Sequence, residues 1–199
     1  VVAVLTSVLA MSTGMLRTME NTGRNDRAIV MRNGSAAENS SALPRDAARL
    51  VGDAAGIKRD TDGKPIISCM RNGLSDAGLD PDQIDYINAH GTSTPENDKM
   101  EYLGVSTVFG ERIKSIPISS NKSMIGHTLT AAGAIEAIVT LLTLEHQRIP
   151  PTINYQMPDP AIPLDVVPNK ARDARVTHAI SNSFGFGGQN LSLVMTREL

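Results

Sequence analysis

Three short polar motifs contain the residues of this chain that could do chemistry. The first is Asn-Ala-His-Gly-Thr-Ser-Thr-Pro at positions 88–95, in which His90 directly follows an apolar run. Ligands of α/β folds bind beyond the carboxyl ends of strands, so a histidine placed there could meet a ligand. A structural histidine bonded within its own loop would show the same pattern. This motif alone therefore favours the structural interpretation.

The second motif is Ser-Asn-Lys-Ser-Met-Ile-Gly-His at positions 120–127, with Lys122 and His127 on either side of a predicted turn. We expect His127 near the N-terminus of a helix over 126–146, where the helix dipole disfavours a charged imidazolium. A neutral histidine could donate a hydrogen bond to a carbonyl or an oxyanion. A solvated lysine and a capping histidine explain the motif equally well.

The third motif is Ser-Asn-Ser-Phe-Gly-Phe-Gly-Gly-Gln-Asn at positions 181–190. Its glycines permit positive φ and close backbone approach. Backbone N–H groups in such a turn can face an oxyanion. An ordinary glycine-rich hairpin is the better interpretation of this motif by itself.

The elements around these motifs predict a layered α/β structure. Apolar spacing and capping residues predict helices at Ile66–Ala77, at Pro95–Phe109 with Thr94 as N-cap, and at Gly126–His146. The last is rich in small residues, so we expect it at the centre of the molecule. Strands are predicted at Ile84–Ala89, Ile116–Ser120, Val176–Ser183 and Leu191–Met195, the final two forming a hairpin.

The first 64 residues differ in character from residues 65–199. Their periodicity is weak, apart from a possible helix at Pro44–Ala54, and much of this segment is expected to be loop or poorly ordered. The apolar run Val1–Met11 is too short to span a bilayer, and we expect it to be a buried helix or strand. A start inside an apolar run suggests a fragment.

Composition excludes several classes of function. The net charge of −2 indicates neither a nucleic-acid surface nor a membrane surface. The single cysteine excludes an internal disulfide framework and fits a reducing cytoplasm, where we expect the protein to be located. A hydrophobic content of 41% is sufficient for a folded core.

Taken together, the order and spacing of the three motifs resemble the condensing enzymes of the thiolase-like fold. The chain is most similar to β-ketoacyl-acyl-carrier-protein synthases of the type II elongating class, from about Ile66 to Leu199. This resemblance implies the C-terminal half of a thiolase-like fold, layered α/β with a mixed sheet. A thiolase fits less well, because it pairs one histidine with a second cysteine.

The resemblance also implies roles for individual residues. In the family, a cysteine is acylated, malonyl carrier protein is decarboxylated, and two histidines stabilise the enolate oxygen. By motif, His90 and His127 match these two histidines, and Lys122 matches the family lysine that supports them electrostatically. Further matches contact the phosphopantetheine arm of the acyl carrier protein (Thr92, Thr94), form the acyl-pocket turn with Phe186 as gate (Phe184, Gly185, Phe186, Gly187), or form a possible Na or K site (Asn88, Glu136, Ser181, Asn182). No other cofactor is implied, and Glu136 could equally be a structural carboxylate.

The chain departs from the family in two ways. The family nucleophile belongs to the N-terminal half, whereas Cys69 lies in a helix that is structural in the family and is expected to be a small buried hydrophobe. Residues 1–64 also lack the family's Arg-Pro-Phe-Asp and Gly-Glu-Gly-Ala segments.

Two hypotheses follow from these departures. The chain is a fragment or split subunit that condenses malonyl and acyl thioesters when a cysteine-bearing half is present. Alternatively, it is a non-catalytic partner resembling a chain-length factor. The implied partners are acyl carrier protein and a second ketosynthase chain, in a homodimer or heterodimer.

Overall fold

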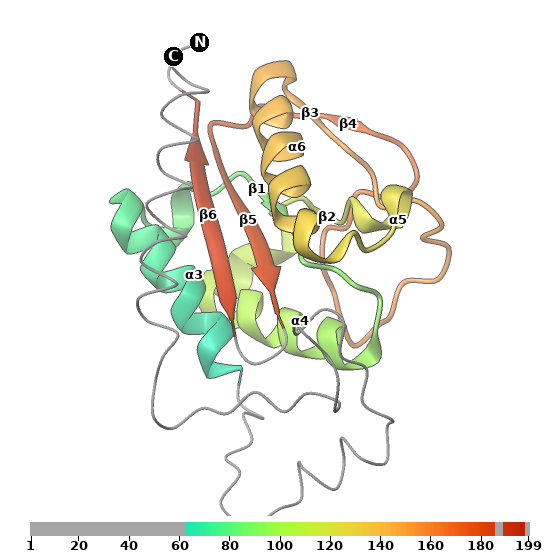
Figure 1. The fold of residues 1–199 in the computed structure, drawn as a ribbon, viewed down its shortest axis with the longest axis horizontal. Helices are drawn as coiled ribbons and strands as arrows, with labels where there is room; N and C mark the ends of the chain where they lie inside the picture. Colours follow the sequence, from blue (N-terminus) through green and yellow to red (C-terminus); the bar gives the residue numbers. More distant parts are fainter. Residues whose placement is uncertain (1–62, 186–188, 198–199) are drawn as a thin grey trace, which may run out of the picture. The chain divides into compact units, whose positions relative to one another are not determined.

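The computed structural model describes residues 63–185 and 189–197, which belong to one compact unit, Asp46–Leu199 (Figure 1). The predicted helix at Pro44–Ala54 and the apolar run Val1–Met11 lie outside the described residues. Phe186 and Gly187, predicted to form part of the acyl-pocket turn, also lie outside them.

A four-stranded mixed sheet forms the framework of the described part. Its strand order is β2 (Ile118–Ser119), β1 (Tyr86–Asn88), β5 (His178–Phe184) and β6 (Asn190–Thr196). β1 is parallel to both β2 and β5, whereas β6 runs antiparallel to β5. The predicted α/β class and the predicted final hairpin are both confirmed. A separate antiparallel pair joins β3 (Arg148–Ile149) to β4 (Arg172–Asp173).

Helices cover both faces of this sheet. Side chains alternate between faces along a strand, and Tyr86 and Ala179 belong to a buried cluster with Leu144 of α6 (Ala132–His146). Their neighbours Ile87 and Ile180 belong instead to the core formed with α3 (Lys64–Ala77) and α4 (Pro95–Phe109). The sheet therefore lies between α6 on one face and α3 with α4 on the other (Figure 1).

Capping residues determine where α3 and α4 begin and end, largely as predicted. α3 ends at Gly78, whose φ of 65° is the left-handed conformation common at helix C-termini. α4 begins at Pro95, and the Thr94 side chain accepts a hydrogen bond from Asn97 N. Short 3₁₀ turns at Pro81–Gln83 and Gly110–Lys114 connect these helices to the strands.

The predicted helix over 126–146 is shorter than expected. A single helical turn, α5 (Lys122–Ile125), is followed by a loop and a 3₁₀ turn (Leu129–Ala131), and α6 begins only at Ala132. Positive φ angles at Gly126 (74°) and Leu129 (53°) interrupt the α-helix between them. His127 therefore lies in the loop before α6, and the predicted start of this helix at Gly126 is wrong.

α6 packs closely on the sheet through its small residues. A Cβ atom added to Gly133 would lie 3.4 Å from Ser183 Oγ on β5, and Ala132 and Ala137 are buried. The opposite side of α6 is apolar and open, with Ile138 58% and Leu142 45% exposed. We expected this helix to be buried at the centre of the molecule, but in the described residues one of its sides is open.

The segment Leu129–His146 is long and apolar enough to cross a membrane by length and composition alone. One side of α6 nevertheless places Glu136, Thr140 and Thr143 in buried positions against the rest of the domain. This pattern is typical of a core helix.

Candidate active site

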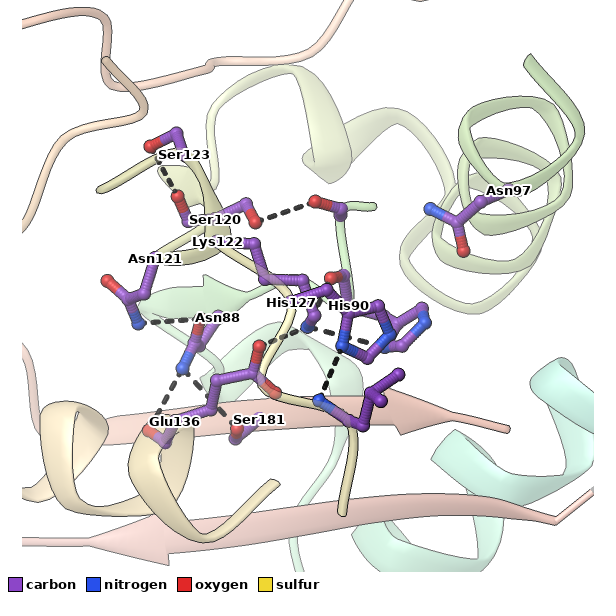
Figure 2. A network of polar contacts seen from close by, with 12 residues as sticks. Asn88, His90, Asn97, Ser120, Asn121, Lys122, Ser123, His127, Glu136 and Ser181 are labelled. Atoms are coloured by element: carbon purple, nitrogen blue, oxygen red, sulfur yellow. Dashed lines mark hydrogen bonds and ion pairs between the residues drawn. The ribbon is translucent and has the colours of Figure 1, made fainter. Parts of the chain in front are cut away.

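Lys122 and His90 meet at the carboxyl ends of β1 and β2, where the sequence predicted a site (Figure 2). His90 follows β1 after a single residue, and Lys122 follows β2 after two. Lys122 Nζ donates to His90 O at 2.6 Å and lies 3.5 Å from His90 Nδ1. Two motifs separated by about 30 residues are thus joined directly.

A buried ion pair fixes the Lys122 ammonium group. Its partner is Glu136 Oε1 on α6, and the two side chains are 5% and 1% exposed. Burial raises the pKa of the Glu136 carboxyl, and Lys122 opposes that rise. An isolated charge is costly to bury, so the attraction between Lys122 and Glu136 offsets the desolvation cost of each.

The geometry assigns the same tautomer to both histidines. Lysine can only donate, so His90 Nδ1 must face Lys122 as an acceptor and carry its proton on Nε2. Leu129 N donates to His127 Nδ1 at 3.1 Å, which leaves the proton of His127 on Nε2 as well. The two rings lie edge to face with centroids 5.6 Å apart (Figure 2).

Both histidines are held in the neutral form. Burial lowers the pKa of His90 to about 4, with further contributions from Lys122 and His127. Desolvation and Lys122 also lower the pKa of His127, which is more exposed. The site therefore combines two neutral imidazoles whose Nε2–H groups can donate hydrogen bonds to a ligand oxygen.

Glu101 supports the His90 loop, a role that the sequence motifs did not reveal. Its two oxygens accept hydrogen bonds from His90 N and Gly91 N, both at 2.8 Å, and Asn97 Nδ2 donates to it at 3.2 Å. Glu101 is 5% exposed on α4. The sequence shows only a glutamate within the predicted helix Pro95–Phe109, and its burial is known from the structure alone.

The residues predicted as a cation site are only partly brought together. Asn88 Nδ2 donates to Glu136 O and Thr140 Oγ1, both at 3.0 Å, and its Oδ1 accepts from Asn121 Nδ2. Ser181 Oγ lies 3.5 Å from Asn88 Nδ2 on the same face of the sheet. The Asn182 side chain points to the other face, where it contacts Met70 and Ser192.

One atom of this set, Glu136 Oε2, has an environment in which a cation could bind. It is buried and has no hydrogen-bond partner within the part of the chain that the structure describes. An anionic oxygen of this kind suits a monovalent cation, whereas the side chains of Asn88 and Asn182 are already engaged by protein atoms. Of the four predicted residues, Glu136 alone therefore offers a buried side-chain oxygen that a cation could bind.

Four of the six residues predicted to contact substrate are described by the structure. Thr92 Oγ1 and Thr94 Oγ1 are 3.2 Å apart at the exposed end of the His90 loop. The ring centroids of Phe184 and His90 are 5.7 Å apart, and Gly185 N donates to Gln189 O at 2.8 Å. Phe184 is thus the one of these four residues with a ring contact to His90.

Cys69 lies away from the two histidines, on the other face of the sheet. Its thiol donates to Ser192 Oγ at 3.4 Å, on the face of the sheet covered by α3. Burial raises the pKa of the thiol, which disfavours the nucleophilic thiolate. The expected structural role of Cys69 agrees with this position.

Comparison with known proteins places these features in one family. A family model described as the C-terminal domain of beta-ketoacyl synthase matches residues 47–156, more than half of the 199 residues. The match begins upstream of Ile66, the first residue of the resemblance predicted from the motifs. The 3-oxoacyl-[acyl-carrier-protein] synthase 2 of Coxiella burnetii is 46% identical over 149 residues, which are 74% of this chain and 36% of that protein.

Solved structures show the same relationship. The ishigamide ketosynthase/chain length factor has a TM-score of 0.67 and 41% identity, over 69% of this chain and 34% of that one. A ketosynthase solved in complex with its type II polyketide acyl-carrier protein has a TM-score of 0.66 and 41% identity, over 70% and 34% of the respective chains. This chain thus spans about a third of the length of these relatives. It belongs to the β-ketoacyl synthase family, and its described residues form a mixed α/β unit of that family's thiolase-like fold.

Proposed function

We propose that this chain carries the decarboxylation half of a ketosynthase site, which condenses malonyl-acyl-carrier-protein with an acyl thioester. The observation that carries the proposal is the pair of histidine rings with centroids 5.6 Å apart, whose Nδ1 atoms face the donors Lys122 Nζ and Leu129 N. Two neutral donors on one oxygen stabilise an enolate without a competing proton transfer.

The chemistry assigns each group one task. The bond between the malonyl carboxylate and Cα breaks, CO₂ leaves, and the electron pair passes to Cα and the thioester oxygen. His90 and His127 donate hydrogen bonds to that oxygen while it carries the negative charge. The carbanion then attacks the acyl thioester carbonyl, the new C–C bond forms, and the sulfur that held the acyl group leaves as thiolate.

Lys122 acts on this step through His90 rather than on the substrate. It donates to the backbone oxygen of His90 and faces its Nδ1, so it opposes protonation of the ring. A protonated His90 would transfer its proton to the enolate and end the reaction before the carbon attacks.

The acyl group requires a cysteine other than Cys69. Cys69 lies on the opposite face of the sheet from Glu136 and is bonded to Ser192. We propose that a cysteine-bearing ketosynthase half completes the site, in a homodimer or heterodimer. The phosphopantetheine arm would pass Thr92 and Thr94, and the relative solved with its acyl-carrier protein supports that class of partner.

A Na or K ion would bind at Glu136 Oε2, a buried oxygen that has no hydrogen-bond partner among the described residues. No step of the condensation uses it. We also retain the cytoplasm as the predicted location.

Release of CO₂ from labelled malonyl-acyl-carrier-protein tests the proposal. The 199-residue chain is mixed with a cysteine-bearing N-terminal half of a related synthase, and β-ketoacyl product is measured in parallel. We expect His90→Ala and His127→Ala each to lower CO₂ release by roughly 10²–10³-fold. The control is His178→Ala, at the opposite end of β5 from the site. Absence of CO₂ release from a folded mixture would contradict the proposal.

A non-catalytic role is the alternative, favoured by the similarity to a solved ketosynthase/chain length factor. If the chain only assembles with a ketosynthase and shapes its product, replacing both histidines leaves assembly and product length unchanged. A change in either counts against this alternative.

A further inference from the structure

The single helical turn that carries Lys122 depends on other parts of the chain for its position. α5 contains four residues and lacks a side-chain cap at Asn121. Helices this short are not stable by themselves. The contacts that anchor α5 must therefore determine the position of the Lys122 ammonium group relative to His90 and Glu136.

A reciprocal pair of hydrogen bonds joins this turn to the segment Thr152–Ile153. Ser120 N donates to Thr152 Oγ1 at 2.9 Å, just before the turn. Ile153 N donates to Ser123 Oγ at 3.0 Å, just after Lys122. Each backbone donor is thus satisfied by a side-chain oxygen of the other segment, and Lys122 lies between the two bonds.

Ser123, within α5, connects this turn to Ser120 before it and to the segment Thr152–Ile153. Its hydroxyl accepts from Ile153 N and donates to Ser120 O at 2.9 Å (Figure 2). Ser120 Oγ in turn donates to Gly91 O at 2.8 Å, in the loop that holds His90. A displacement of the turn would therefore move both partners of the Lys122–His90 contact.

Thr152 itself is held by a rigid frame. Thr152 N donates to Val167 O at 2.8 Å, and Asn169 N donates to Thr152 O at 2.9 Å. Val167 N then donates to Ile118 O of β2 at 3.0 Å. The hydroxyl of Thr152 is thus fixed by the edge of the sheet independently of α5.

We propose that Thr152 and Ser123 are positioning residues for Lys122, which hold its ammonium group between His90 and Glu136. The role in catalysis rests on the proposed function, because only a condensing site needs Lys122 there. The positioning of Lys122 does not depend on the proposed function, and it can be measured on the full 199-residue chain without turnover.

Exchange of the Lys122 ammonium protons with water provides the measurement, followed by NMR of a lysine-labelled chain. In the parent chain the Lys122 side chain is buried, and Nζ donates to His90 O and to Glu136 Oε1. When Lys122 moves out of this position, its ammonium protons lose these acceptors and exchange faster with water.

We expect Thr152→Val and Ser123→Ala each to raise the exchange rate of the Lys122 ammonium protons, and Thr152→Ser to retain the parent rate because it keeps the hydroxyl. The controls are Thr107→Val and Ser115→Ala, whose exposed hydroxyls bond backbone oxygens of α4 and the turn after it. If Thr152→Val fails to fold, Ser123→Ala tests the same contact.

An unchanged exchange rate in a folded Thr152→Val or Ser123→Ala chain overturns the proposal. An equal rise in either control also overturns it, since general loosening of the fold would then explain the result. In the CO₂-release assay, loss of positioning lowers kcat without raising KM, and Thr152→Ser restores kcat. Faster exchange in the variants, together with a parent chain that shows no activity, would reject the proposed function and keep the positioning.

Discussion

Lys122 and Glu136 form an ion pair with both side chains almost completely buried, although they belong to different helices. Glu136→Gln leaves the ammonium group without this anion. We therefore expect it to lower the free energy of unfolding by about 3–5 kcal/mol. Asp173→Asn is the matched control, because the Arg148–Asp173 pair is exposed, and it should cost less than about 1 kcal/mol. Urea unfolding of the three chains compares these values, and equal losses would contradict the buried character of the pair.

Gly91 is required by a close approach in the His90 loop. A Cβ atom there would lie 2.5 Å from Ser120 Cβ, and φ is 45°. We expect Gly91→Ala to cost about 1–3 kcal/mol for the clash, in addition to about 1–2 kcal/mol for the left-handed backbone. Gly78→Ala has a similar φ of 65° but open space around the Cβ position, so it should show the backbone cost alone. Thermal unfolding distinguishes the two variants, and equal midpoints would argue against the clash.

Glu101 serves two backbone donors at once, which a glutamine cannot do. In Glu101→Gln, the amide NH₂ would face either His90 N or Gly91 N, and one buried N–H would lose its acceptor. The expected loss is about 1–3 kcal/mol of stability, together with reduced CO₂ release because the His90 loop moves. Glu145→Gln on the exposed side of α6 is the control. Wild-type CO₂ release by Glu101→Gln would show that this carboxylate does not position His90.

The depressed pKa of His90 makes part of the stability depend on pH. Between pH 6.5 and about 4 the unfolded chain binds a proton at this residue that the folded chain does not bind. The contribution of neutral His90 is therefore complete above pH 6.5 and is lost as the pH falls toward 4. The raised pKa values of Glu101 and Glu136 act in the opposite direction, so a comparison of variants is needed.

His90→Gln removes only the histidine contribution. We expect the unfolding free energy of the parent, relative to this variant, to rise between pH 4 and pH 6.5 and to remain level above pH 7. Urea titrations at a series of pH values test this. Parallel pH profiles for the two chains would show that His90 titrates normally in the folded protein.

Local rules were sufficient for the helices whose ends are determined by capping. Thr94, Pro95 and Gly110 predicted the limits of α4, and Gly78 predicted the end of α3, because caps act within one turn of the chain. The histidine motifs were likewise recognisable from their residues and order. The same reasoning was wrong for the helix expected at 126–146, since positive φ at Leu129 has no reliable signature in a leucine side chain.

The sequence by itself thus determined the family, the fold class and the two histidines with Lys122. Only the tertiary structure decided how these groups are held: Glu101 under the His90 loop, Glu136 beside Lys122, and Thr152 behind the Lys122 turn. Each of these contacts joins segments at least 10 residues apart. Their energies depend on burial and on the alignment of donor and acceptor, and neither property is encoded in local residue spacing.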